Sequence, residues 1–173
     1  KFGLEYVATG SMLEQEIKKG TETGKRITAL YENGQLVPDE IVVQLIEKKL
    51  SDSKDVKGLI FKGFPRTLVQ SYILDGLLQK HASSISKIIE IQVPTLELIR
   101  RLDARSKTAG CMPYDNSTSK IVKRLQEHEA KTVPVIEKYN QLHGVVKIDG
   151  QGTFDEVFER ISAEIESGLK SMR

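Results

Sequence analysis

The sequence predicts an α/β fold built on a doubly wound parallel sheet. Three near-continuous apolar runs, at residues 58–61, 88–93 and 145–148, have the length and composition of buried parallel strands. A helical pattern follows each run, so strands and helices alternate along the chain. At 173 residues the chain fits one domain with a sizeable core. Ligands of such folds bind beyond the carboxyl ends of the strands, so the candidate site is expected at that edge.

The first part of the chain begins with a short strand. Residues 4–8 are β-prone, and Thr9-Gly10-Ser11 then opens a helix. Asn33-Gly34 ends the segment that follows. Pro38-Asp39-Glu40 starts another helix, because proline suits the first helical position and carboxylates complement the helix dipole.

Helices also follow the three apolar runs. One extends from Thr67 to about Lys80, and one continues from Pro94 through Arg105. The last helix carries an apolar stripe at helical spacing, formed by Phe154, Val157, Phe158, Ile161 and Ile165. Residues 106–119 form the one polar, turn-rich stretch, which predicts a mobile flap.

Composition excludes several classes of function. Lys and Arg number 26 against 24 Asp and Glu, a net charge of +2 with no general attraction to nucleic acid or membrane. The single cysteine, Cys111, allows no intrachain disulfide and no multi-cysteine zinc site. No run reaches the roughly 18 apolar residues of a membrane span, so a soluble protein of a reducing, cytoplasmic compartment is expected.

Arg66 is the first candidate ligand-binding residue, because it follows Gly63-Phe64-Pro65 at the end of a predicted strand. Its guanidinium would lie where ligands bind in such sheets and is suited to bidentate contact with a phosphate. A solvated arginine on a surface turn explains the same five residues equally well.

Three further arginines indicate the same chemistry. Arg101 and Arg105 are four residues apart and share a helical face, and Arg124 lies on the helix after the polar stretch. Gathered on a phosphate chain, they would neutralise the charge that develops during phosphoryl transfer. From these residues alone, three solvated helix arginines are the alternative.

The other motifs point to no chemistry. The segment at residues 20–26 departs from the Walker phosphate loop, which has four residues between its glycines and Ser or Thr after its lysine. His81, His128 and His143 lack metal-ligand spacing, and no protein metal site is expected. Cys111 has no conspicuous base beside it and is interpreted as a bystander thiol.

Six motifs in this chain occur in the order and rough spacing of the adenylate kinases: Thr9-Gly10, Gly24-Lys25, Gly34-Gln35-Leu36-Val37-Pro38, Gly63-Phe64-Pro65-Arg66-Thr67 with Gln70, Arg101 with Arg105, and Lys123-Arg124-Leu125 with Thr132-Val133-Pro134-Val135-Ile136. The chain resembles this family along essentially its whole length. Gly-Phe-Pro-Arg-Thr is the most diagnostic motif. Thr67 after the arginine is closer to the AMP enzymes than to UMP/CMP kinases, in which asparagine is usual at that position.

The resemblance implies a P-loop nucleoside-monophosphate kinase fold. Residues 1–173 would form a single domain, with a monophosphate-binding part at about 9–38 and a short lid without zinc at about 106–116. The implied reaction is reversible phosphoryl transfer from ATP to AMP, giving ADP, with Mg²⁺ carried by ATP, in a monomeric enzyme. A UMP/CMP-type kinase and a catalytically degenerate nucleotide-binding module are the alternatives.

The resemblance also assigns roles by position. It implies these AMP-binding residues: Thr9, Gly10, Gln35, Leu36, Val37, Gly63, Phe64, Pro65, Arg66, Gln70 and Arg124. It implies these ATP-binding residues: Arg101, Arg105 and Gly152. Arg66, Arg105 and Arg124 would be catalytic, through positioning and charge neutralisation rather than a covalent step.

The sequence also departs from the family's pattern. The family's first strand and glycine-rich phosphate loop are expected just upstream of Lys1, so a central strand and the cradle for the ATP triphosphate are not among these residues. Ser11 replaces an aspartate, Glu14 an arginine that binds the AMP phosphate, and Lys62 an aspartate that orders the magnesium waters. Cys111 aligns with a lid arginine. The replacements at 14, 62 and 111 favour reduced or altered activity.

Overall fold

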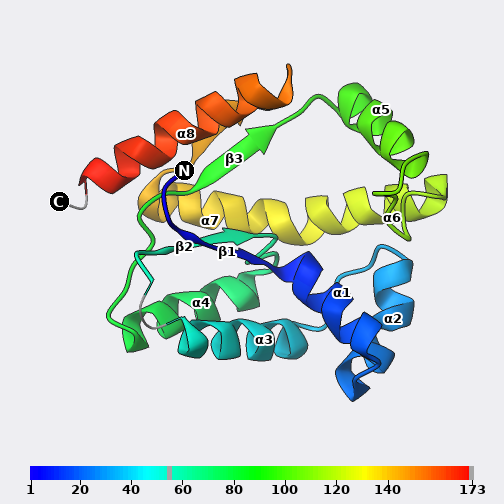
Figure 1. The fold of residues 1–173 in the computed structure, drawn as a ribbon, viewed down its shortest axis with the longest axis horizontal. Coiled ribbons are helices and arrows are strands. Elements are labelled where there is room, and N and C mark those ends of the chain that lie inside the picture. Colours follow the sequence, from blue (N-terminus) through cyan, green and yellow to red (C-terminus); the bar gives the residue numbers. More distant parts are fainter. Residues whose placement is uncertain (54–55, 172–173) are drawn as a thin grey trace.

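The structure is a computed structural model that describes residues 1–53 and 56–171, and its fold is mixed α/β, as predicted (Figure 1). The strands are Glu5–Ala8 (β1), Leu59–Lys62 (β2), Ile89–Gln92 (β3) and Val146–Asp149 (β4). The helices are Thr9–Lys19 (α1), Glu22–Glu32 (α2), Asp39–Asp52 (α3), Leu68–Lys80 (α4), Thr95–Ser106 (α5), Thr118–Glu127 (α6), Val133–His143 (α7) and Phe154–Ser171 (α8). A π-helical turn, His128–Thr132 (η1), joins α6 to α7.

The strands form two parallel pairs. β1 pairs with β2, with Val7 opposite Phe61, and β3 pairs with β4, with Ile91 opposite Ile148. Within the described residues no ladder joins the two pairs, so the predicted sheet is present as two halves. In Figure 1 strands β2 and β3 run toward the side of the molecule that holds α1, α5 and α6. The carboxyl ends of the strands therefore meet those helices, where the site was expected.

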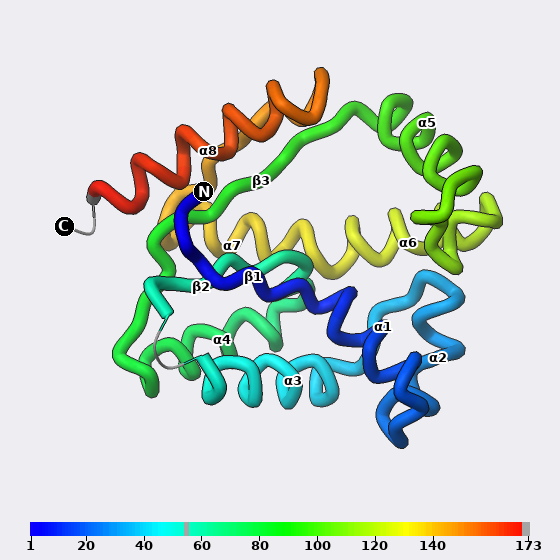
Figure 2. Tube along the Cα trace, in the orientation of Figure 1, coloured from blue at the N-terminus to red at the C-terminus, as the bar shows by residue number. Residues whose placement is uncertain are grey.

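Helices cover the two strand pairs separately. Figure 1 shows α3 and α4 side by side beneath β1 and β2, and α4 also contacts α7. Helix α8 packs against β4. The tube in Figure 2 shows α6, η1 and α7 as one nearly continuous rod across the middle of the molecule. This rod begins just after the predicted lid at about residues 106–116 and extends to α4.

The main hydrophobic core lies among β1, α1, α2, α3 and α4. Ile27 and Ile46 are fully buried, and Val7 is 1% exposed. On α3 the buried residues Val42, Ile46 and Leu50 are four apart and face the core together. Burying each such side chain stabilises the fold by about 1.5–3 kcal/mol.

The glycines at residues 20–26 serve helix packing, in agreement with the rejection of a phosphate loop. Gly20 ends α1 in a left-handed conformation, and Thr21 caps α2 by accepting a hydrogen bond from the backbone N–H of Gly24 at 2.9 Å. A Cβ at Gly24 would lie 2.1 Å from the carbonyl oxygen of Glu16, so α1 and α2 pack with backbone in contact.

The apolar stripe predicted for the last helix is only partly buried. Phe154 is 82% exposed and Phe158 is 41% exposed, and their rings stack with centroids 6.2 Å apart. Four-residue strands span about 13 Å whereas an 18-residue helix spans about 27 Å. The β3–β4 pair is therefore too short to cover the whole stripe. None of the described helices has both the length and the apolar character needed to cross a bilayer.

Candidate functional site

A cavity of about 320 Å³ opens where β1 and β2 end. Its lining combines the start of α1, the α2–α3 connection, the loop after β2, and side chains of α4, α5 and α6. Ten predicted site residues line it: Thr9, Gly10, Gln35, Leu36, Val37, Gly63, Arg66, Gln70, Arg105 and Arg124. The fold thus gathers most of the predicted residues in one place.

Four predicted residues lie outside this cavity lining. Phe64 is 5% exposed and belongs to the core, where its ring packs on Phe61, and Pro65 follows it. Arg101 is exposed on α5, and its Nε donates to Glu97 Oε1 at 2.8 Å. Gly152 lies in the turn between β4 and α8, with φ of 107°.

The turn after β2 holds Arg66 beside Thr9. The carbonyl oxygen of Gly63 accepts hydrogen bonds from Thr9 Oγ1 at 2.8 Å and from Arg66 Nε at 2.9 Å. Gly63 has a φ of 77°, and a Cβ there would lie 2.8 Å from Arg66 Nη2 and 2.9 Å from Thr9 Oγ1. Only glycine fits this turn without displacing both neighbours.

The backbone of Arg66 is held from two sides. Its N–H donates to Gln70 Oε1 at 2.8 Å, and its carbonyl accepts from Thr132 Oγ1 at 3.1 Å. Thr132 ends the π-helical turn η1, which interrupts the α-helical register between α6 and α7. The sequence pattern did not predict this turn, because its signal is a backbone register rather than a residue type.

Two arginines at the cavity lack a carboxylate partner. Burial lowers the pKa of Arg66, and the nearby charge of Arg124 lowers it further. Across residues 1–53 and 56–171, neither guanidinium forms an ion pair with an acidic side chain. Two adjacent cations without a direct ion-pair partner among the described residues make this part of the cavity suited to a polyanion such as a phosphate chain.

Arg105 is held by residues 106–116, the segment predicted to form a lid, which we call the lid segment. Its Nε and Nη2 donate to the two carboxylate oxygens of Asp115 at 2.7 and 2.8 Å, and the N–H of Met112 donates to the same carboxylate at 3.0 Å. Burial disfavours the charged carboxylate, yet these hydrogen bonds outweigh burial and keep the pKa of Asp115 below its usual value. The pair fixes Arg105 at the cavity with its remaining donors free for a ligand.

The lid segment also closes onto α2 through two tyrosines. The rings of Tyr31 and Tyr114 meet edge to face with centroids 6.1 Å apart, and the Arg124 guanidinium lies 4.2 Å from the centre of the Tyr114 ring. Tyr31 donates its hydroxyl proton to Glu14 Oε1 at 2.6 Å. Burial, together with this bond, raises the pKa of Tyr31. Sequence analysis missed both tyrosines, because they are far apart in the chain.

The residues that depart from the family's pattern fall into two groups. Ser11, Glu14 and Lys62 line the cavity. Cys111 is exposed on the lid outside the cavity lining, and its Sγ donates weakly to the carbonyl of Met112 at 3.4 Å. Glu14 and Lys62, the two charged replacements, therefore lie at the cavity, whereas Cys111 is outside its lining.

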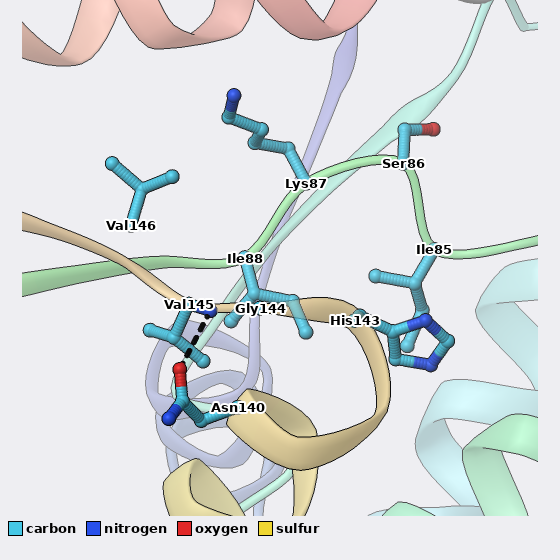
Figure 3. Close-up of a pocket in the computed structure, with 9 residues that line it drawn as sticks. All are labelled: Ile85, Ser86, Lys87, Ile88, Asn140, His143, Gly144, Val145 and Val146. Atoms are coloured by element: carbon cyan, nitrogen blue, oxygen red, sulfur yellow. Dashed lines mark hydrogen bonds between the residues drawn. The ribbon is translucent and has the colours of Figure 1, made fainter.

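A second cavity, of about 410 Å³, lies near the starts of β3 and β4 (Figure 3). None of the predicted site residues lines it. Two of its polar side chains have partners within the protein: Asn140 Oδ1 accepts from the N–H of Val145 at 3.1 Å, and Lys87 pairs with Glu164 at 3.0 Å. Figure 3 shows the Asn140 side chain turned toward Val145.

Comparisons with known proteins all point to one family. A profile of the family described as Adenylate kinase matches residues 1–144. The chain is 37% identical over 166 residues to "Adenylate kinase" of Phocaeicola vulgatus, covering 96% of this chain and 87% of that protein. It is 39% identical over 164 residues to "Adenylate kinase" of Maricaulis maris, covering 95% and 86%. The protein of the same name from Stenotrophomonas maltophilia is 34% identical over 165 residues, covering 95% and 87%.

Proposed function

Because this chain belongs to the adenylate kinase family, a family of phosphotransferases, we propose that it transfers a phosphoryl group reversibly from ATP-Mg to AMP and gives two ADP. The observation that carries this proposal is the meeting of Arg66, Arg105 and Arg124 at one cavity from three separate elements. Phosphoryl transfer needs positioning and neutralisation of charge on the phosphates, which this arrangement supplies without a covalent intermediate.

AMP is assigned to the cavity beside α1 and the α2–α3 connection. Arg66, held on the Gly63 carbonyl, would hold the monophosphate, and Gln70 would contact the base. The residues that would enclose the adenosine are Thr9, Gly10, Gln35, Leu36 and Val37. Residues 9–38 are accordingly proposed as the monophosphate-binding part, and Phe64 and Pro65 remain proposed AMP-binding residues on family resemblance alone.

ATP-Mg is assigned to the side of the cavity bounded by α5 and the lid. Arg105, fixed by Asp115, would hold the donor phosphates, and Arg124 would reach the phosphates of both nucleotides. Arg101 and Gly152 are proposed near the ATP base on family resemblance alone. The lid segment would exclude water, which otherwise competes as the phosphoryl acceptor.

The family assignment supports this function over a UMP/CMP-type kinase or a binding module without turnover. We also propose that phosphoryl transfer is slower than in family members with the usual residues. The Glu14 carboxylate lies at the cavity assigned to the AMP phosphate, and by family resemblance Lys62 replaces a residue that orders magnesium waters. A monomeric, cytoplasmic enzyme is proposed by analogy with the family.

An acceptor panel tests the proposal. The natural full-length protein is given ATP-Mg with AMP, UMP or CMP, and diphosphate formation is followed by a coupled assay. We expect the highest kcat/KM with AMP. A higher kcat/KM with UMP or CMP would show that this nucleotide, rather than AMP, is the acceptor. Formation of no diphosphate with any acceptor would support a binding module without turnover.

A further inference from the structure

Gln70 is a buried amide with both of its ends occupied. Its side chain lines the cavity, yet the residue is only 2% exposed. Its Oε1 accepts from the N–H of Arg66 at 2.8 Å, and its Nε2 donates to Asp39 Oδ1 at 2.8 Å. A third residue, Thr67, donates its hydroxyl proton to the same Asp39 oxygen at 3.0 Å.

These partners allow only one orientation of the amide. A backbone N–H is always a donor, and a carboxylate is an acceptor only. Rotation of the Gln70 amide by half a turn would set Nε2 against the N–H of Arg66 and Oε1 against the carboxylate of Asp39. Both contacts would become repulsive, and an unsatisfied buried polar group costs about 1–3 kcal/mol.

A fixed amide orientation has a consequence for the base. After its two internal bonds, Gln70 retains one N–H and one oxygen lone pair for a ligand. A 6-aminopurine offers a donor at position 6 beside ring nitrogens that accept, whereas a 6-oxopurine has an acceptor at position 6. In the orientation held by Asp39, the free N–H and lone pair of Gln70 complement the 6-aminopurine pattern and oppose the 6-oxopurine pattern.

We propose that Asp39 is a positioning residue that fixes the Gln70 amide and so makes the acceptor site discriminate 6-aminopurine from 6-oxopurine monophosphates. The inference rests on the proposed function, because Gln70 is assigned to the acceptor base there. Asp39 belongs to the first turn of α3 and, within the described residues, is outside the cavity lining and reaches it through its hydrogen bonds with Gln70 and Thr67. Its role is therefore distinct from that of the residues lining the cavity.

The test compares AMP with IMP, which differ only at positions 1 and 6 of the purine. Asp39→Ala removes one of the two contacts that fix the amide and leaves only the Arg66 N–H, so the amide turns more readily and the ratio of kcat/KM for AMP to that for IMP should fall by about tenfold. Asp39→Asn keeps the single oxygen that accepts both hydrogen bonds, so it should restore most of this ratio. Asp39→Leu repeats the comparison should the alanine variant be unstable.

Glu40→Ala is the matched control. Glu40 is an exposed carboxylate in the same turn of α3, so this variant changes the charge at the helix start without touching Gln70. Its AMP to IMP ratio should stay at the wild-type value. A purely structural Asp39 would lower kcat/KM for both substrates equally, and an unchanged ratio in folded Asp39→Ala would overturn the inference. If the wild type itself fails to phosphorylate AMP, the proposed function has failed instead.

Discussion

The family resemblance implies an arginine for the AMP phosphate at the position of Glu14, and in the structure the carboxylate of Glu14 has a partner in the Tyr31 hydroxyl. That single hydrogen bond leaves the negative charge in place, beside a cavity that also holds Arg66 and Arg124. The carboxylate would repel the phosphate while partly offsetting the two guanidiniums. Weaker AMP binding, rather than loss of the fold, is the expected consequence.

Neutralising this carboxylate should therefore tighten AMP. Glu14→Gln keeps an oxygen that accepts from Tyr31 and removes the charge, so KM for AMP should fall by about fivefold, on the order of 1 kcal/mol. Glu14→Arg should lower it further by adding a phosphate donor. Tyr31→Phe removes the hydrogen bond and keeps the charge, and so separates the two effects. A rise in KM for AMP with Glu14→Gln would show that the carboxylate serves binding.

At the scale of elements, α4 and α7 are joined by a partly buried polar cluster. Lys138 Nζ donates to Asp75 Oδ2 at 2.6 Å and to Ser71 Oγ at 3.0 Å, and the Tyr139 hydroxyl donates to Asp75 Oδ1 at 3.1 Å. Helix α7 continues from η1, whose Thr132 holds the Arg66 carbonyl. The cluster therefore anchors the rod that positions both Arg124 and Thr132.

This cluster predicts a loss of stability at alkaline pH. Burial and the charge of Asp75 raise the pKa of Tyr139, so the folded tyrosine keeps its proton above the ordinary value of about 10 while the unfolded one loses it. Stability is full below that value, and the free energy of unfolding then falls by up to about 1.4 kcal/mol per pH unit for this group. Tyr31 contributes in the same direction.

Urea unfolding between pH 7 and 11 measures this effect. Tyr139→Phe should cost about 1–2 kcal/mol at neutral pH and should flatten part of the alkaline decline. Tyr6→Phe, at an exposed tyrosine of β1, is the control and should leave the pH profile unchanged. Equal alkaline slopes for wild type and Tyr139→Phe would refute the assignment.

Across the whole molecule, sequence patterns predicted the elements better than their contacts. The Gly63 to Thr67 motif located Arg66 because a strand end and a turn are local features, and Thr67 indeed caps α4. The Tyr31–Tyr114 contact and the Arg105–Asp115 pair depend on how distant segments pack, so spacing could not reveal them. The stripe on α8 was predicted correctly as a pattern, but its exposure depends on the length of the strands beneath it.

Arg66, Arg105 and Arg124 line one cavity and are proposed to serve phosphoryl transfer rather than stability. Arg66 has no acidic partner among the described residues, and both burial and Arg124 disfavour its charge. Removing it should therefore leave the fold as stable as before, or slightly more stable. The same guanidinium is proposed to hold the monophosphate, so activity should depend on it strongly.

The decisive measurement is the initial rate of ADP formation by the natural full-length protein and its Arg66→Ala variant, with thermal unfolding recorded on the same samples. Arg26→Ala, at an exposed arginine of α2, is the matched control and should behave as wild type. We predict a loss of about a hundredfold to a few thousandfold for Arg66→Ala, equivalent to about 3–5 kcal/mol, with no fall in unfolding temperature. A folded Arg66→Ala variant that makes ADP at the wild-type rate would contradict the account.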